Sequence, residues 1–99
     1  MTHTLTDARE LLTVASAIAE ADGRYGDSAT YLGERAAVGT YSRRAATDSV
    51  PSVLLWSAAG SVERLADSAA AQDLPELNAL DSAAHWLQSA ALLAQEGGL

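Results

Sequence analysis

The chain has 99 residues, which suits a single domain, and 48% of them are hydrophobic, which excludes a chain that is disordered by composition. Its net charge of −7 argues against direct binding to nucleic acid or to anionic membranes, because both require clustered cations. The absence of cysteine excludes disulfides, thiolate zinc sites, iron–sulfur clusters and cysteine nucleophiles.

The N-terminal stretch "MTHTLTDARELL" bears on location. It is polar and soon acidic, so it lacks the features of a cleavable signal peptide. Elsewhere no apolar run approaches the roughly 18 residues that a membrane-spanning helix needs. We therefore expect a cytoplasmic protein that does not bind membranes.

Hydrophobic residues recur with a helical period, and the first helix is predicted over residues 7–21. Asp7 is its expected N-cap, with Glu10 three residues later at the capping-box spacing. Gly23 lies just beyond the expected end, where glycine adopts the left-handed conformation easily. The predicted buried face consists of Ala8, Leu11, Leu12, Ala15, Ile18 and Ala19.

The second helix is predicted over residues 28–46, with Asp27 or Ser28 as its N-cap. Its expected inner stripe is small and shallow, and it consists of Leu32, Ala36, Gly39 and Ala46. Glycine at 33 and 39 costs about 1 kcal/mol per site relative to alanine in a helix. These glycines indicate either the close approach of another backbone or a weak helix.

Two further helices are predicted over residues 51–71 and 74–95. Pro51 suits the first turn of the third helix, and Asp73 with Glu76 gives the fourth helix a capping-box spacing. The expected core positions of the third helix are Leu54, Ala58, Val62, Leu65, Ala66 and Ala69. The fourth helix carries two apolar stripes, Leu77/Leu80/Ala84/Leu87/Ala91 and Ala79/Ala83/Trp86/Ala90/Leu93. A helix that is apolar over so much of its circumference is central in the fold or docks onto another surface.

The short connections between these helices predict antiparallel neighbours. We therefore expect an all-α fold, an up-down bundle of about four helices formed by residues 1–99 as one domain. Much of the hydrophobic content is alanine, which buries little area per residue. The core should accordingly be thin, which favours close helix packing or burial against a partner.

The stretch "EADGRYGDSATYLGERA", residues 20–36, concentrates acids, glycines and tyrosines. A calcium loop would need oxygen ligands where Gly23 and Tyr25 stand, so the pattern favours the corner of a helical hairpin. Tyr25 and Tyr31 are expected to pack across this hairpin, with Arg24 on the outside.

Asp81 and His85 stand one helical turn apart on the fourth helix. Such a pair suits a carboxylate–histidine metal site, and a metal- or ligand-binding bundle centred on it is the alternative function. A solvent-facing helical pair accounts for the same spacing. The sequence contains no nucleophile elbow and no phosphate-binding glycine loop, so we predict no catalytic residue, no cofactor and no bound metal.

Residues 9–42 carry a helix–turn–helix spacing through Leu12, Ala15, Ser16 and Ala19, followed by the turn "GRYGDS" and by Ser28 and Leu32. This spacing resembles one tetratricopeptide repeat, although Arg35 and Thr40 depart from the pattern. The resemblance implies a helical hairpin and a groove that binds peptides. Separately, "LLWSAAG" is similar to the Trp-x-Gly turn of WXG-type small secreted helical proteins, but Gly60 comes two residues late. This resemblance implies a WXG-like secreted helical protein as a further alternative function.

These features predict a non-enzymatic protein that acts through protein–protein association, as a self-assembling protein, an adaptor or an inhibitor of its partner. The thin alanine faces and the apolar fourth helix favour a homodimer or a larger protein partner. No small-molecule substrate is indicated. The predicted interface residues are the larger aromatic and apolar side chains Trp56, Trp86, Leu93, Tyr31 and Tyr41.

Overall fold

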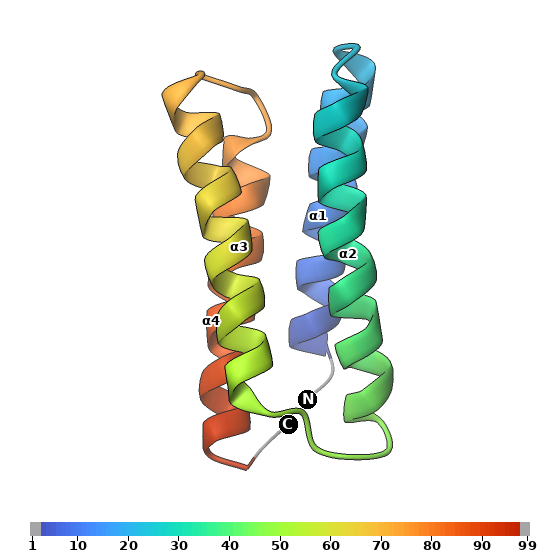
Figure 1. Ribbon diagram of the computed structural model, residues 1–99, viewed down its shortest axis with the longest axis vertical. Helices are drawn as coiled ribbons and strands as arrows, with labels where there is room; N and C mark the ends of the chain where they lie inside the picture. Colours follow the sequence, from blue (N-terminus) through green and yellow to red (C-terminus); the bar gives the residue numbers. More distant parts are fainter. Residues whose placement is uncertain (1–2, 98–99) are drawn as a thin grey trace.

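The computed structural model describes residues 3–97 and shows the predicted up-down four-helix bundle (Figure 1). Its helices are α1 (His3–Ala21), α2 (Tyr25–Ala45), α3 (Ser52–Ala71) and α4 (Leu77–Gln95). They lie side by side in a particle of 40 × 21 × 16 Å. The α1–α2 and α3–α4 loops therefore meet at one end, and the α2–α3 connection lies at the other.

The bundle consists of two helical hairpins, α1–α2 and α3–α4, that join mainly through α1 and α4. Helices α2 and α3 make few contacts with each other. Helix α4 thus packs against two helices, which explains why two of its faces are apolar. Of the two alternatives predicted for α4, a central position in the fold or docking onto another surface, the structure shows the first.

The core is thin, as predicted, because more than half of its buried hydrophobic residues are alanine. Small side chains let the helices approach closely, but each contributes little buried area. Larger volume comes from a few fully buried leucines and valines on all four helices: Leu5, Leu12, Val38, Leu55, Val62, Leu80 and Leu87.

Three of the predicted helix starts are wrong. Helix α1 begins at His3, so Asp7 lies inside it; α2 begins at Tyr25, before Asp27 and Ser28; and α4 begins only at Leu77. Each prediction relied on a capping side chain, yet no N-cap of α2, α3 or α4 has a side-chain cap hydrogen bond. At α2 and α4 the N-cap residues are Arg24 and Glu76.

The same C-terminal motif ends α1 and α3. In α1, Gly23 has φ +75°, and the Arg24 N–H donates to the Ala19 carbonyl at 2.9 Å. In α3, Asp73 has φ +54°, and the Leu74 N–H donates to the Ala69 carbonyl at 2.9 Å. These six-to-one bonds define Schellman motifs. Asp73 therefore terminates α3 and does not cap α4 as predicted.

The predicted inner stripe of α2 is also wrong, since Leu32, Ala36 and Ala46 are exposed and only Gly39 is buried. The buried face instead contains Ser28, Tyr31, Val38 and Gly39. Two of these side chains are polar, and their hydroxyls are satisfied inside the protein. The Ser28 and Ser16 hydroxyls lie 2.7 Å apart, for example. A hydrophobicity pattern cannot identify a face that is buried through hydrogen bonds.

The glycines of α2 do not mark a close backbone approach. A Cβ at Gly33 would meet nothing within 4 Å, and the three atoms nearest to one at Gly39 would all belong to arginine side chains, at 3.5 Å or more. These residues therefore weaken the helix without a packing reason.

Candidate functional site

A buried ion pair joins the two hairpins at the end where their loops meet. Arg24, in the α1–α2 loop, donates from Nη1 and Nη2 to the two carboxylate oxygens of Glu76 at 2.6 and 2.7 Å. The same guanidinium donates to Asp22 and Asp27, each at 2.9 Å. Bidentate geometry of this kind is the strongest form of arginine–carboxylate contact.

Tyr31 completes this cluster, which we call the polar clasp (Asp22, Arg24, Asp27, Tyr31 and Glu76). Its hydroxyl donates to Glu76 Oε2 at 2.7 Å. The hydrogen bonds from Arg24, and secondarily that from Tyr31, lower the pKa of the fully buried Glu76 to about 2. Burial and the same hydrogen bond raise the pKa of Tyr31 above its ordinary value. The pKa of Arg24 is raised as well, chiefly by Glu76.

The clasp corrects two predictions about the loop stretch and agrees with a third. Arg24 is not outside the fold, since its side chain is only 22% exposed. Tyr25 does not pack across the hairpin, because it is 68% exposed. Tyr31 does lie inside, and at 3% exposure it is unavailable as an interface residue in this structure. The buried charges are thus committed to holding the two hairpins together.

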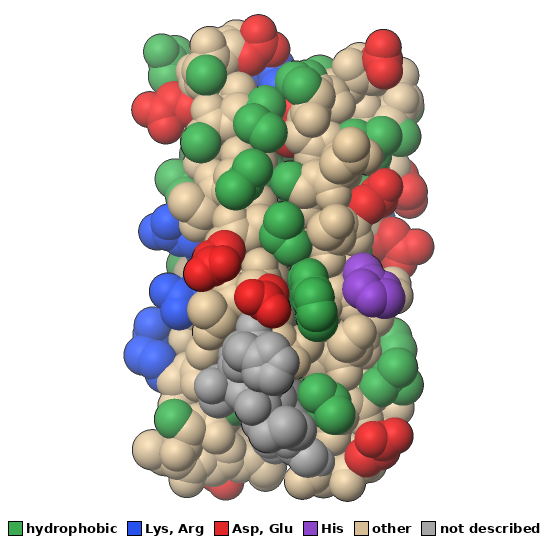
Figure 2. Space-filling model, turned by 180° about the vertical axis from the view of Figure 1, so that it is seen from behind, with side chains coloured by type: hydrophobic (Ala, Val, Ile, Leu, Met, Phe, Trp, Pro, Cys, Tyr) green, Lys and Arg blue, Asp and Glu red, His purple; other side chains and the backbone are tan. Residues whose placement is uncertain are grey.

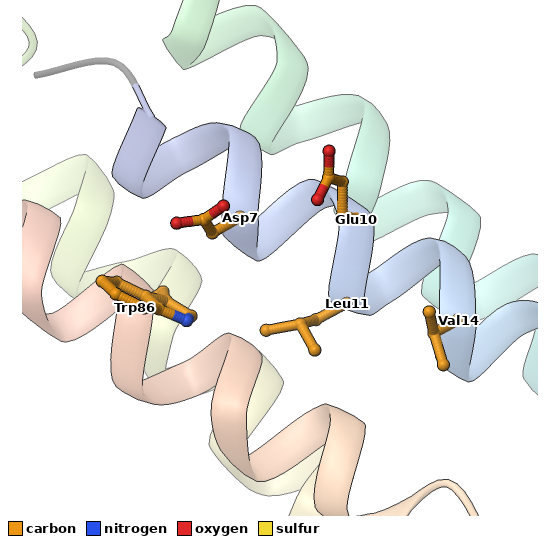
Figure 3. Close-up of a pocket in the computed structure, with 5 residues that line it drawn as sticks. All are labelled: Asp7, Glu10, Leu11, Val14 and Trp86. Atoms are coloured by element: carbon orange, nitrogen blue, oxygen red, sulfur yellow. The ribbon is translucent and has the colours of Figure 1, made fainter.

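An open depression of about 410 Å³ lies on the outside of the seam between α1 and α4. Figure 2 shows hydrophobic side chains in a line along this face, with acidic groups beside them. Figure 3 shows four lining residues on α1 and the fifth, Trp86, facing them from α4. We call this the seam depression; its lining is Asp7, Glu10, Leu11, Val14 and Trp86.

The seam depression combines an apolar floor with an acidic rim. Trp86 is partly buried and Val14 is 48% exposed, so apolar surface remains open to solvent. Figure 3 shows the Leu11 side chain directed from α1 toward α4, and the Asp7 carboxylate near the indole of Trp86. Trp86 also makes an edge contact with His85, with ring centroids 6.0 Å apart. Such a surface suits association with an apolar, positively charged group.

The remaining predicted interface residues do not form one patch. Leu93 lies seven residues after Trp86, on the same partly buried face of α4. Trp56, which is 38% exposed, belongs to α3, where the exposed Val53 precedes it by three residues. Tyr41 is partly buried against the core on α2. Only Trp86 and Leu93 therefore share a helix face.

Asp7 and Glu10 lie at the rim of the seam depression, which the sequence did not predict. They were expected to cap a helix, and they instead form the rim of the seam depression. Their position one turn apart on an outward face could have suggested an acidic rim. Their pairing with Trp86 depends on how α1 packs against α4, which the sequence does not state.

The alternative site at Asp81 and His85 gains little from the structure. Both side chains are exposed on α4. Across residues 3–97, no three His, Cys, Asp or Glu side chains gather as they would around a metal ion. In the same residues, no helix is long and apolar enough to span a bilayer.

Comparisons with protein families, characterised proteins and solved structures give no significant match to this chain. The tetratricopeptide-like and WXG-type resemblances therefore stay predictions.

Proposed function

We propose that the protein is non-catalytic and acts by binding a protein partner through the α1–α4 seam. The observation that supports this proposal is the open seam depression, where Leu11, Val14 and Trp86 leave apolar surface accessible beside two carboxylates. Tryptophan at the centre of an apolar patch is a frequent binding hot spot. The cytoplasmic location expected from the sequence belongs to the same proposal.

The distribution of charged groups also supports a binding role. The strongest electrostatic interactions lie in the polar clasp, where Glu76 is fully buried and bonded to Arg24 and Tyr31. That cluster is committed to the fold. The residues that line the seam depression do not place a general base beside a nucleophile, so they suit binding and not catalysis.

The test compares two exposed valines on different faces. Val14→Asp places a charge in the seam depression, whereas Val53→Asp makes the same change on α3, where Val53 is 69% exposed. Each variant and the parent chain are used to capture binding proteins from the native host, and sedimentation velocity measures self-association. We expect Val14→Asp to abolish partner capture and Val53→Asp to leave it unchanged.

Two results would contradict the proposal. One is a partner that Val14→Asp retains at full strength. The other is a partner that only Val53→Asp loses, which would move the interface to the α3 face around Trp56. Circular dichroism of both variants confirms that each remains folded.

A further inference from the structure

The charges around the seam depression restrict which partner could fit it. Within residues 3–97, the carboxylates of Asp7 and Glu10 have no hydrogen bond or ion pair. No arginine lines the depression. The rim therefore presents negative charge that no residue in the described part of the chain neutralises, on a chain whose net charge is −7.

None of the six arginines of the chain lines the seam depression. Arg24 belongs to the polar clasp, and the Arg9 guanidinium lies near Gly39 of α2, where its Nε is buried without a hydrogen-bond partner. Arg35 donates to Thr13 at 3.3 Å, and Arg64 donates to Ser61 at 3.3 Å. Figure 2 shows most of the visible basic side chains along one edge of this face, away from the middle of the hydrophobic line. The seam depression is accordingly a local acidic field over an apolar floor.

We propose that the seam depression receives an arginine side chain from a basic, amphipathic helical segment of the partner; this inference rests on the proposed function. A guanidinium stacks on an indole and donates to carboxylates at the same time, so Trp86 and Asp7 suit it together. Apolar residues on the same face of the partner helix would cover Leu11 and Val14. The seam runs along both α1 and α4, so a helical segment fits lengthwise into the groove between them.

Charge favours this occupant over a second copy of the chain. Each copy carries a net charge of −7, so two copies repel each other at long range. A basic segment is instead attracted toward the rim before contact. The partner class is therefore a protein with a cationic amphipathic helix.

The experiment uses synthetic helical peptides as probes. The first carries arginine with leucines three and four positions away, so that all three share one face. The second replaces arginine with glutamate, and the third replaces the leucines with alanine. Binding is followed by the fluorescence of Trp86 in a Trp56→Phe background, where it is the only tryptophan, because the chain contains two.

Paired variants test the rim directly. Asp7→Asn with Glu10→Gln removes both rim charges, and the control Glu63→Gln with Asp67→Asn removes two exposed charges from α3. We expect the arginine peptide to bind, the glutamate peptide to bind at least about tenfold more weakly, and the rim variant to lose a similar factor. The α3 control should retain nearly full affinity, and added salt should weaken the arginine peptide most.

Equal binding of the arginine and glutamate peptides, or full affinity in the rim variant, would overturn the inference. If both charged peptides still bind through the leucines, the seam remains an interface and the proposed function survives. If no peptide binds while Val14→Asp still abolishes capture of the native partner, the inference fails and the proposed function again survives. If no peptide binds and Val14→Asp also leaves capture of the native partner unchanged, both the inference and the proposed function are refuted.

Discussion

Replacing Glu76 with glutamine tests whether the polar clasp holds the two hairpins together. Glutamine has nearly the same shape and can still accept the hydrogen bond from Tyr31. It removes the negative charge that faces Arg24 through two contacts of 2.6 and 2.7 Å. The change therefore isolates the charge of the pair from its volume.

The lowered pKa gives the expected magnitude. A shift from 4.5 to about 2 corresponds to about 3 kcal/mol of unfolding free energy at neutral pH. Removing one partner of a buried ion pair costs about 3–5 kcal/mol in general. The low end applies here, because Arg24 is partly exposed and keeps its contacts with Asp22 and Asp27.

The pH dependence follows from the direction of the shift. Since the pKa of Glu76 is lower in the folded state than the ordinary value of 4.5, its contribution is complete above that pH. The contribution is lost as the pH falls toward about 2, where folded and unfolded states are both protonated. The difference between Glu76→Gln and the parent chain should therefore shrink steadily over this range.

Urea denaturation followed by far-ultraviolet circular dichroism measures the unfolding free energy at neutral pH and at steps down to about pH 3. Glu63→Gln, a change at an exposed glutamate of α3, is the matched control and should stay within about 0.5 kcal/mol of the parent. A Glu76→Gln effect below about 1 kcal/mol at neutral pH, or one that does not vary with pH, would refute the reasoning.

Three other changes have distinct expected outcomes. Tyr31→Phe removes a hydrogen bond to a buried carboxylate and should lower the unfolding free energy by about 2 kcal/mol. Because the pKa of Tyr31 is raised in the folded state, the parent should lose stability above pH 10, and the variant should not show this loss. Alkaline denaturation curves that match for the two proteins would contradict the pH prediction. Gly33→Ala should raise the unfolding free energy by about 1 kcal/mol and the melting temperature by several degrees, because no atom obstructs a Cβ there. A lower melting temperature in calorimetry would contradict this prediction. Asp73→Gly should stabilise the protein by about 0.5 kcal/mol, since Asp73 has a positive φ, which glycine adopts without strain. Gly23→Ala at the equivalent position should destabilise the protein for the same reason. Urea midpoints that reverse this order would contradict the role of the two residues in the Schellman motifs.

Much of the fold follows from local patterns in the sequence. The apolar periods of α1, α3 and α4 predict much of their buried faces, since Ala8, Leu12 and Leu80 are all in the core, although in α3 the fully buried residue is Leu55 and not the predicted Leu54. Periodicity succeeds in these helices because most of their buried side chains are apolar, with Thr4 and Ser16 of α1 as exceptions. It fails in α2, where Tyr31 is buried through its hydrogen bond to Glu76.

The candidate site could be predicted only in part. Trp86 and Leu93 were selected as interface residues, and they share a partly buried face of α4. Asp7 and Glu10 were assigned to a capping box, because a capping spacing looks the same whether or not a helix begins there. The extension of α1 to His3 places both acids on an outward helical surface instead.

The sequence by itself determined the helical class, the number of helices and the thin alanine core, because propensity and apolar period act over neighbouring residues. Only the tertiary structure decided which side chains meet across the bundle. Arg24 and Glu76 are 52 residues apart, and they meet because an up-down bundle brings alternate loops to the same end. Trp86 likewise faces Leu11 and the acids of α1 only because α4 packs against α1. Long-range pairing of this kind depends on how the helices pack, and no local pattern encodes it.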